Sequence, residues 1–196
     1  LRRRTAALDE EQRRPDAHQQ ATEHAVLLPD GARIAEKALA DILGEIRPGV
    51  TEKEIAALLL YKMLHYGAED KSFDPIVVSG PNGSLPHGVP SEKPIQAGEF
   101  VTMDFGCIYH GYCSDMTRTV PVNGKFTPRQ RAVYESVLNM MTYAKKILRP
   151  GILKSEYERL VRVFAAGELV KLGLITPAQV AEKPSDPPIE IGRAHV

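Results

Sequence analysis

Cysteine is scarce in this sequence of 196 residues, and neither sign of charge is in excess. The two cysteines, Cys107 and Cys113, are too few for a disulfide framework, which favours a reducing compartment and predicts a cytoplasmic protein. Lysine plus arginine and aspartate plus glutamate both number 25, so no basic excess indicates a nucleic-acid partner. No apolar run approaches the ~18–20 residues that a membrane span needs, so no membrane partner is predicted either.

The two ends of the sequence differ in composition from the stretch between them. The chain begins Leu1-Arg2-Arg3-Arg4, without an initiator methionine or the apolar stretch of a secretory signal, so we interpret its start as cut or processed. Residues 1–20 are polar and charged, and we expect a frayed end or a linker remnant. The closing EIGRAHV resembles the translation of a common sequencing-adapter oligonucleotide, so we interpret residues 189–196 as a non-native tail. The rest is long and apolar enough for one globular domain.

Hydrophobic periodicity predicts helices and strands in one domain, an α+β fold. Pro29 is expected to interrupt the first helix, with a restart near Asp30. Thr51 and Glu54 have the spacing of a capping box. The short link His110-Gly111 between two β-rich runs predicts a hairpin. The expected helices are 21–46, 51–66 and 127–148, and the expected strands are 75–79, 99–109 and 112–122.

An internal repeat is one interpretation of two Arg-Pro-Gly segments. Arg47-Pro48-Gly49 and Arg149-Pro150-Gly151 are 149 − 47 = 102 residues apart, and each stands between two helical patterns. The alternative is coincidence, because Pro and Gly end helices in general. If the repeat is real, a second strand unit should begin near residue 177, and the chain ends before completing it.

The predicted hairpin contains two carboxylates, Asp104 and Asp115. Aspartate is disfavoured in strands, yet Asp104 stands among apolar residues. If Tyr109 opposes Tyr112 across the link, Asp104 opposes Thr117, and Asp115 falls on the same face. Their Cα atoms should then be ~7–8 Å apart.

Two carboxylates on one partly buried face repel each other and need a compensating positive charge. Divalent cations suit such oxygen ligands, and Gly106, opposite Asp115, would leave room for an ion or for substrate. The alternative is that each carboxylate pairs with a cation such as Arg118, or that it is solvated. Cys113 is expected on the carboxylate face as a small buried side chain, and Met140 and Met141 are expected in the helix core.

A longer motif covers the hairpin and both flanks. It runs FDPIVVSGPNGSLPHGVPSEKPIQAGEFVTMDFGCIYHGYCSDMTRTVPVNGKFTPRQ, from Phe73 to Gln130. This stretch resembles the proline-specific branch of the pita-bread metallopeptidases, the Xaa-Pro aminopeptidases (aminopeptidase P) and Xaa-Pro dipeptidases. The SG-x-N and PH segments, the DFG segment, the eleven residues from Asp104 to Asp115, and SDMTRT all coincide with that family. The resemblance implies that residues 21–188 are the N-terminal portion of a pita-bread catalytic domain.

The resemblance also implies roles for three residues. Asp104 would bind one metal ion, Asp115 would bridge two, and His87 in the PH segment would line the substrate site as a catalytic-site residue. Two divalent ions are implied, with Mn favoured and Co or Zn as alternatives. The family's remaining ligands, one His and two Glu, have no counterpart before this sequence ends, so the chain by itself is expected to be inactive.

The TRTVPVNGKFTPRQ segment looks most like aminopeptidase P. The expected full-length protein is therefore a cytoplasmic Xaa-Pro aminopeptidase, a homo-oligomer acting on peptides with proline at the second position. One alternative is the dipeptidase of the same family. Another is a non-enzymatic pita-bread binding module, and a third is a metal-free creatinase-like hydrolase; retention of both Asp104 and Asp115 argues against these last two.

Overall fold

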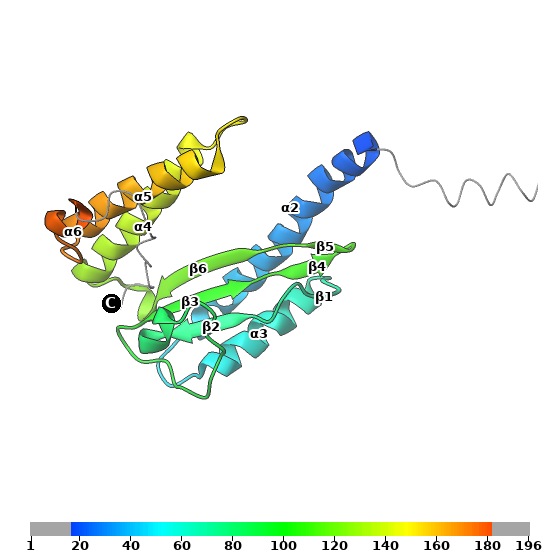
Figure 1. The fold of residues 1–196 in the computed structure, drawn as a ribbon. Helices are drawn as coiled ribbons and strands as arrows, with labels where there is room; N and C mark the ends of the chain where they lie inside the picture. The colour runs from blue at the N-terminus through cyan, green and yellow to red at the C-terminus, as the bar shows by residue number, and fades with distance from the viewer. Residues whose placement is uncertain (1–16, 182–196) are drawn as a thin grey trace, which may run out of the picture. The chain divides into compact units, whose positions relative to one another are not determined.

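The computed structural model describes residues 17–181 (Figure 1). The chain divides into two compact units: one comprises the residues up to Gly83 together with His87–Val122, and the other comprises Ser84–Pro86 and the residues from Asn123 onward. The expected tail, 189–196, lies outside the described residues, and so does most of the expected frayed end, 1–20.

The first unit is built on two small antiparallel sheets. Their strand orders are β1-β4-β5 and β2-β3-β6. The strands are β1 Asp70–Lys71, β2 Ile76–Ser79, β3 Phe100–Phe105, β4 Cys107–Tyr109, β5 Tyr112–Cys113 and β6 Met116–Pro121. The predicted hairpin therefore exists, but each of its two long strands is divided in two, and β1 was not predicted.

The register of the hairpin confirms the prediction. Tyr109 pairs with Tyr112 and Asp104 pairs with Thr117. The link His110-Gly111 has φ angles of 49° and 76°, the left-handed values that a two-residue hairpin turn requires. Because this turn fixes the pairing, the faces on which the side chains lie follow from it.

The strands break where Gly106 approaches another part of the chain. A Cβ atom at Gly106 would overlap the carbonyl oxygen of Ser114 and the hydroxyl of Ser72. The Ser72 hydroxyl donates to the Ser114 carbonyl at 2.7 Å, and the Ser72 amide donates to the Gly106 carbonyl at 3.1 Å. Ser72 thus joins both strands at the break.

Helices α2 (Ala17–Ile42) and α3 (Glu52–His65) supply the apolar cover of the sheet (Figure 1). Along β3, Val101, Met103 and Phe105 are fully buried, and they alternate with the half-buried Thr102 and Asp104. The buried face belongs to the same apolar cluster as the two helices. The other face, which carries Asp104, is the open face of the sheet.

Two features of these helices bear on the predictions. The Thr51–Glu54 capping box of α3 is present. Pro29, however, lies inside a continuous α2, so the predicted restart near Asp30 is wrong. The helix also begins at Ala17, four residues before the predicted start. Proline removes one helical hydrogen bond, and the remaining ones carry the helix across it.

The second unit is helical in its described part. It contains α4 (Pro128–Ile147), α5 (Lys154–Lys171) and α6 (Pro177–Ala181). The start of α4 matches the prediction, and Thr127 and Gln130 form its capping box. Met141 is 47% exposed, so its expected place in a helix core is wrong.

The repeat remains a prediction. Gly49 and Gly151 adopt similar left-handed φ angles of 95° and 84°, and each is followed by a helix. Residues 177–181 are helical, which differs from the strand that a strict repeat of 75–79 would place there.

In the described part of the chain, three short 3₁₀ segments connect these elements: η1 Leu43–Glu45, η2 Gly80–Ser84 and η3 Val122–Gly124. Within residues 17–181, no helix combines the length and apolar character needed to cross a membrane.

Candidate metal and substrate site

Asp104 lies on the open face of the sheet, half-buried, between β2 and β6. Its Cα partners are Ile76 on β2 and Thr117 on β6. The Thr117 hydroxyl donates to its Oδ1 at 2.8 Å. That single neutral donor orients the carboxylate and leaves acceptor capacity for a cation, because an ionised carboxylate has about four lone-pair sites.

Asp115 is exposed, in the break between β5 and β6. Its neighbours on either side are buried: Met116 belongs to the apolar cluster, and the Ser114 side chain lies beside Gly31 of α2. Alternation along the chain therefore predicts Asp115 on the open face with Asp104. The distance between the Cα atoms of Asp104 and Asp115, expected at ~7–8 Å, stays a prediction.

Arg118 is turned away from the carboxylates. It pairs with Met103, a residue of the buried face, and its guanidinium lies 3.9 Å from the Glu36 carboxylate of α2. The alternative interpretation paired Asp104 and Asp115 with a cation such as Arg118. The Arg118 guanidinium instead lies beside Glu36 of α2.

Two expectations near the site are wrong. Gly106 does not leave room for an ion on the side where its Cβ would stand, because Ser72 and the Ser114 carbonyl fill that space. Cys113 is exposed rather than buried, and Cys107 is the buried cysteine, its thiol donating to the Gly31 carbonyl at 3.4 Å. Both thiols are free, and burial raises the pKa of Cys107.

His87 is exposed and lines a cavity of about 670 Å³ in the first unit. One wall comes from α3, and includes Ala56 and Leu60; another includes Ile76, the strand neighbour of Asp104. The cavity is therefore lined by Ile76, the residue of β2 that pairs with Asp104. That His87 and Asp104 serve one site stays a prediction.

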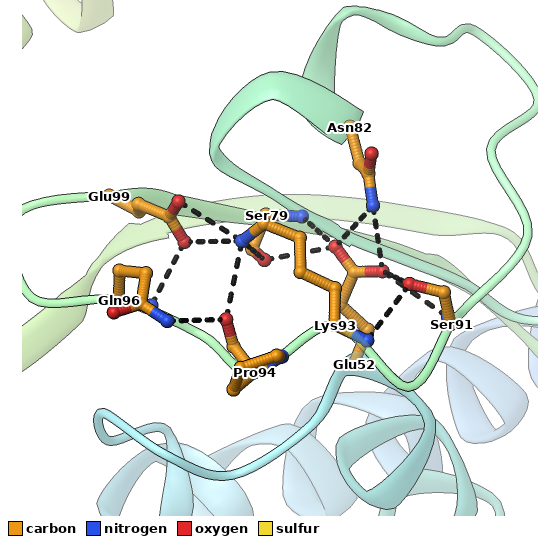
Figure 2. Close-up of polar contacts among 8 residues, drawn as sticks. All are labelled: Glu52, Ser79, Asn82, Ser91, Lys93, Pro94, Gln96 and Glu99. Atoms are coloured by element: carbon orange, nitrogen blue, oxygen red, sulfur yellow. Dashed lines mark hydrogen bonds and ion pairs between the residues drawn. The ribbon is translucent and has the colours of Figure 1, made fainter.

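Glu52, a buried carboxylate at the start of α3, was not predicted from the sequence. Its side chain is completely buried, and it accepts hydrogen bonds from Ser79, Asn82 and Ser91 (Figure 2). The SG-x-N segment carried a signal, because Ser79 and Asn82 are its polar members. Ser79 ends β2, and Asn82 lies in η2.

Glu52 is held as an anion by neutral donors. Burial acts to raise the pKa of its carboxyl, and the hydrogen bonds from Ser91, Ser79 and Asn82 act to lower it; the result lies below the ordinary value. Glu52 is also the first residue of α3, where the positive end of the helix dipole favours a negative charge.

Within residues 17–181, no three His, Cys, Asp or Glu side chains converge as a metal site would require. The oxygen donors at the candidate site are those of Asp104 and Asp115. Their chemistry suits a hard divalent ion, and the set is smaller than the complete ligand shell of such an ion.

The chain is similar in sequence and in structure to known peptidases. Residues 27–181 match the model of metallopeptidase family M24. The Xaa-Pro dipeptidase of Pyrococcus furiosus is 39% identical over 140 residues, 71% of this chain and 40% of that protein. The Xaa-Pro aminopeptidase of Escherichia coli is 36% identical over 168 residues, 83% of this chain and 38% of that protein. A solved structure, proline aminopeptidase P II from Yersinia pestis, gives a TM-score of 0.76 at 35% identity, over 82% of this chain and 38% of that one.

The chain therefore belongs to metallopeptidase family M24. Its likeness to solved aminopeptidase P and prolidase structures confirms the expected α+β pita-bread architecture. The chain spans well under half the length of the relatives that it matches.

Proposed function

We propose that this chain is part of the catalytic domain of a metal-dependent aminopeptidase that hydrolyses the bond between an N-terminal residue and a following proline. The observation that carries the proposal is the open face of β3 and β6. There Asp104 keeps acceptor capacity beside Thr117, while Arg118 faces Glu36. The Xaa-Pro peptidases among the relatives support the substrate class.

Asp104 and Asp115 are the residues that would hold the metal. Their carboxylate oxygens suit Mn²⁺, with Co²⁺ or Zn²⁺ as alternatives. A divalent ion held there supplies a Lewis acid that activates water and polarises the scissile carbonyl. Thr117 keeps Asp104 in one orientation. His87 contacts the substrate from the cavity that it lines.

Two carboxylates do not complete the site. We propose that one further His and two further Glu, outside residues 17–181, complete it in the full protein. The chain by itself should then bind Mn²⁺ weakly and show no peptidase activity.

A manganese titration tests the metal site. Purified chain is titrated with Mn²⁺, and the loss of the free-ion electron paramagnetic resonance signal is recorded. Asp104→Asn and Asp115→Asn should each weaken binding by about tenfold or more. Asp70→Asn, which removes an exposed acid on β1, is the matched control and should bind as the parent does. Equal binding by all four proteins would refute the site.

The segment TRTVPVNGKFTPRQ, which looks most like aminopeptidase P, favours the aminopeptidase over the dipeptidase. The solved relatives are similar to this chain on both sides of that choice: the X-Pro aminopeptidase from Thermotoga maritima gives a TM-score of 0.69 and the prolidase from Pyrococcus furiosus one of 0.68. The complete gene product should therefore cleave an Xaa-Pro-Pro-Xaa peptide as well as an Xaa-Pro dipeptide. Cleavage of the dipeptide alone would assign it to the dipeptidases.

A non-enzymatic binding module is the alternative from another class. Such a protein would bind an Xaa-Pro peptide without consuming it, with or without Mn²⁺. We further expect the complete protein to be cytoplasmic and homo-oligomeric. Size-exclusion chromatography with light scattering would measure the molar mass of the oligomer.

A further inference from the structure

The segment that carries His87 is tied at both ends to one carboxylate. On one side, Ser79 donates to Glu52 Oε1 through its amide at 2.7 Å and its hydroxyl at 2.9 Å, and Asn82 donates to both oxygens at 3.1 Å. On the other side, Ser91 donates to Oε2 through its amide at 3.2 Å and its hydroxyl at 2.7 Å. His87 stands between Asn82 and Ser91 in the chain, so Glu52 closes the base of this loop (Figure 2).

The start of α3 holds the far end of the same loop through the backbone. The Glu52 amide donates to the Lys93 carbonyl at 3.2 Å, and the Lys53 amide donates to the Ser91 carbonyl at 3.1 Å. These are amides that a helix leaves without partners in its first turn. The backbone and side chain of Glu52 therefore anchor the loop to a rigid element.

A second tie runs from Ser79 to Glu99. Lys93 Nζ donates to the Ser79 hydroxyl at 2.9 Å and to the Glu99 carboxylate at 2.8 Å and 3.0 Å (Figure 2). The Ser79 hydroxyl thus accepts from Lys93 and donates to Glu52. This polar chain joins α3, the end of β2 and residue 99, which precedes β3.

We infer that Glu52 is a positioning residue for His87: its buried carboxylate fixes the loop 80–90 and so places the imidazole at the cavity. The inference rests on the proposed function. Glutamine cannot replace the carboxylate, because its carboxamide has one acceptor oxygen and would turn an NH₂ group toward donors.

A double-mutant cycle in the complete gene product tests the inference, with Xaa-Pro-Pro-Xaa as substrate. Glu52→Gln should raise KM or lower kcat/KM by about tenfold, since a small misplacement of a binding group has a large kinetic effect. In an His87→Ala background, Glu52→Gln should change kcat/KM by less than about twofold, because residues that act through one another are not additive. If Glu52→Gln lowers kcat/KM by the same factor in the parent and in the His87→Ala protein, the inference is wrong.

Glu168→Gln is the matched control. Glu168 is also a buried glutamate, but it lies on α5 in the second unit and contacts Lys171. It should change kcat/KM by less than about twofold in both backgrounds. If Glu52→Gln does not fold, Ser91→Ala removes one donor hydroxyl and should shift kcat/KM in the same direction by a smaller factor.

Amide hydrogen exchange on the present chain separates the two proposals, because it needs no turnover. Glu52→Gln should speed exchange in residues 83–90, and Glu168→Gln should leave it unchanged. An inactive gene product with this exchange pattern would refute the proposed function alone. Unchanged exchange in the loop would refute the role of Glu52, whatever the activity.

Discussion

The two compact units bury their apolar side chains to different degrees. In the first unit, residues from α2, α3 and the sheet form one apolar cluster, and several are completely buried, among them Ile55, Met103 and Phe105. In the second unit, α4 and α5 bury small side chains such as Ala165 and Ala166, while Val137 and Val163 are 57% and 62% exposed. The candidate site therefore belongs to the unit with the larger core.

The difference follows from the elements themselves. A sheet with two helices on one face can surround a side chain on every side, whereas two helices enclose only the seam between them. We therefore expect substitutions in the first unit to cost the most stability.

Phe105→Ala should have the largest effect, about 4 kcal/mol of unfolding free energy, because it leaves a cavity beneath β3. Leu138→Ala on α4 is the control; this side chain is 44% exposed, and its loss should cost about 0.5 kcal/mol or less. Urea unfolding followed by circular dichroism measures both. Similar costs would mean that the second unit is as tightly packed as the first.

Gly106→Ala should cost about 3 kcal/mol, since a methyl group there overlaps Ser72 and the Ser114 carbonyl. Gly167→Ala in α5 meets nothing within 4 Å and should stabilise by about 0.5–1 kcal/mol. Thermal unfolding of the two variants should thus give shifts of opposite sign. A stabilising Gly106→Ala would contradict the close approach seen at the strand break.

Glu52→Gln should cost about 2 kcal/mol at neutral pH, because it leaves buried donors without an acceptor. The pKa of Glu52 is lower in the folded protein than in the unfolded chain, so its ionised form stabilises fully above about pH 4.3. That stabilisation is lost as the pH falls through the folded-state pKa.

The stability difference between the parent and Glu52→Gln should therefore shrink as the pH falls below about 4. Urea unfolding at a series of pH values checks it. A difference that grows in acid would mean that the carboxyl is buried in its neutral form.

Thr51→Ala and Thr127→Ala should each cost about 1 kcal/mol, less than Phe105→Ala, Gly106→Ala or Glu52→Gln, because each removes one side of a capping box. The two caps have the same chemistry in the two units, so their costs should agree. Equilibrium unfolding of both variants measures this. A much smaller cost for Thr127→Ala would show that α4 can fray without unfolding the rest of the chain.

Local features of the fold were predictable. The hairpin register follows from a two-residue turn, and the caps of α3 and α4 follow from Thr with Glu or Gln three residues later. Residues close in the chain determine these features, so their pattern is visible without knowledge of the fold.

The strand breaks and the Glu52 cluster were not predictable in this way. Ser72 reaches Ser114 across 42 residues, and Glu52 reaches Ser91 across 39. No local pattern indicates such partners. The Pro29 prediction failed for a related reason, because a continuous helix outweighed a local helix-breaking preference.

The sequence by itself determined the alternation that brings Asp104 and Thr117 to one face, since neighbouring strands joined by a short turn have little freedom of register. Only the tertiary structure decided that Arg118 faces Glu36 and that Glu52 is buried beneath the His87 loop. Charged side chains have no fixed partner until the chain packs, and burial then selects the partners that lie within hydrogen-bonding distance.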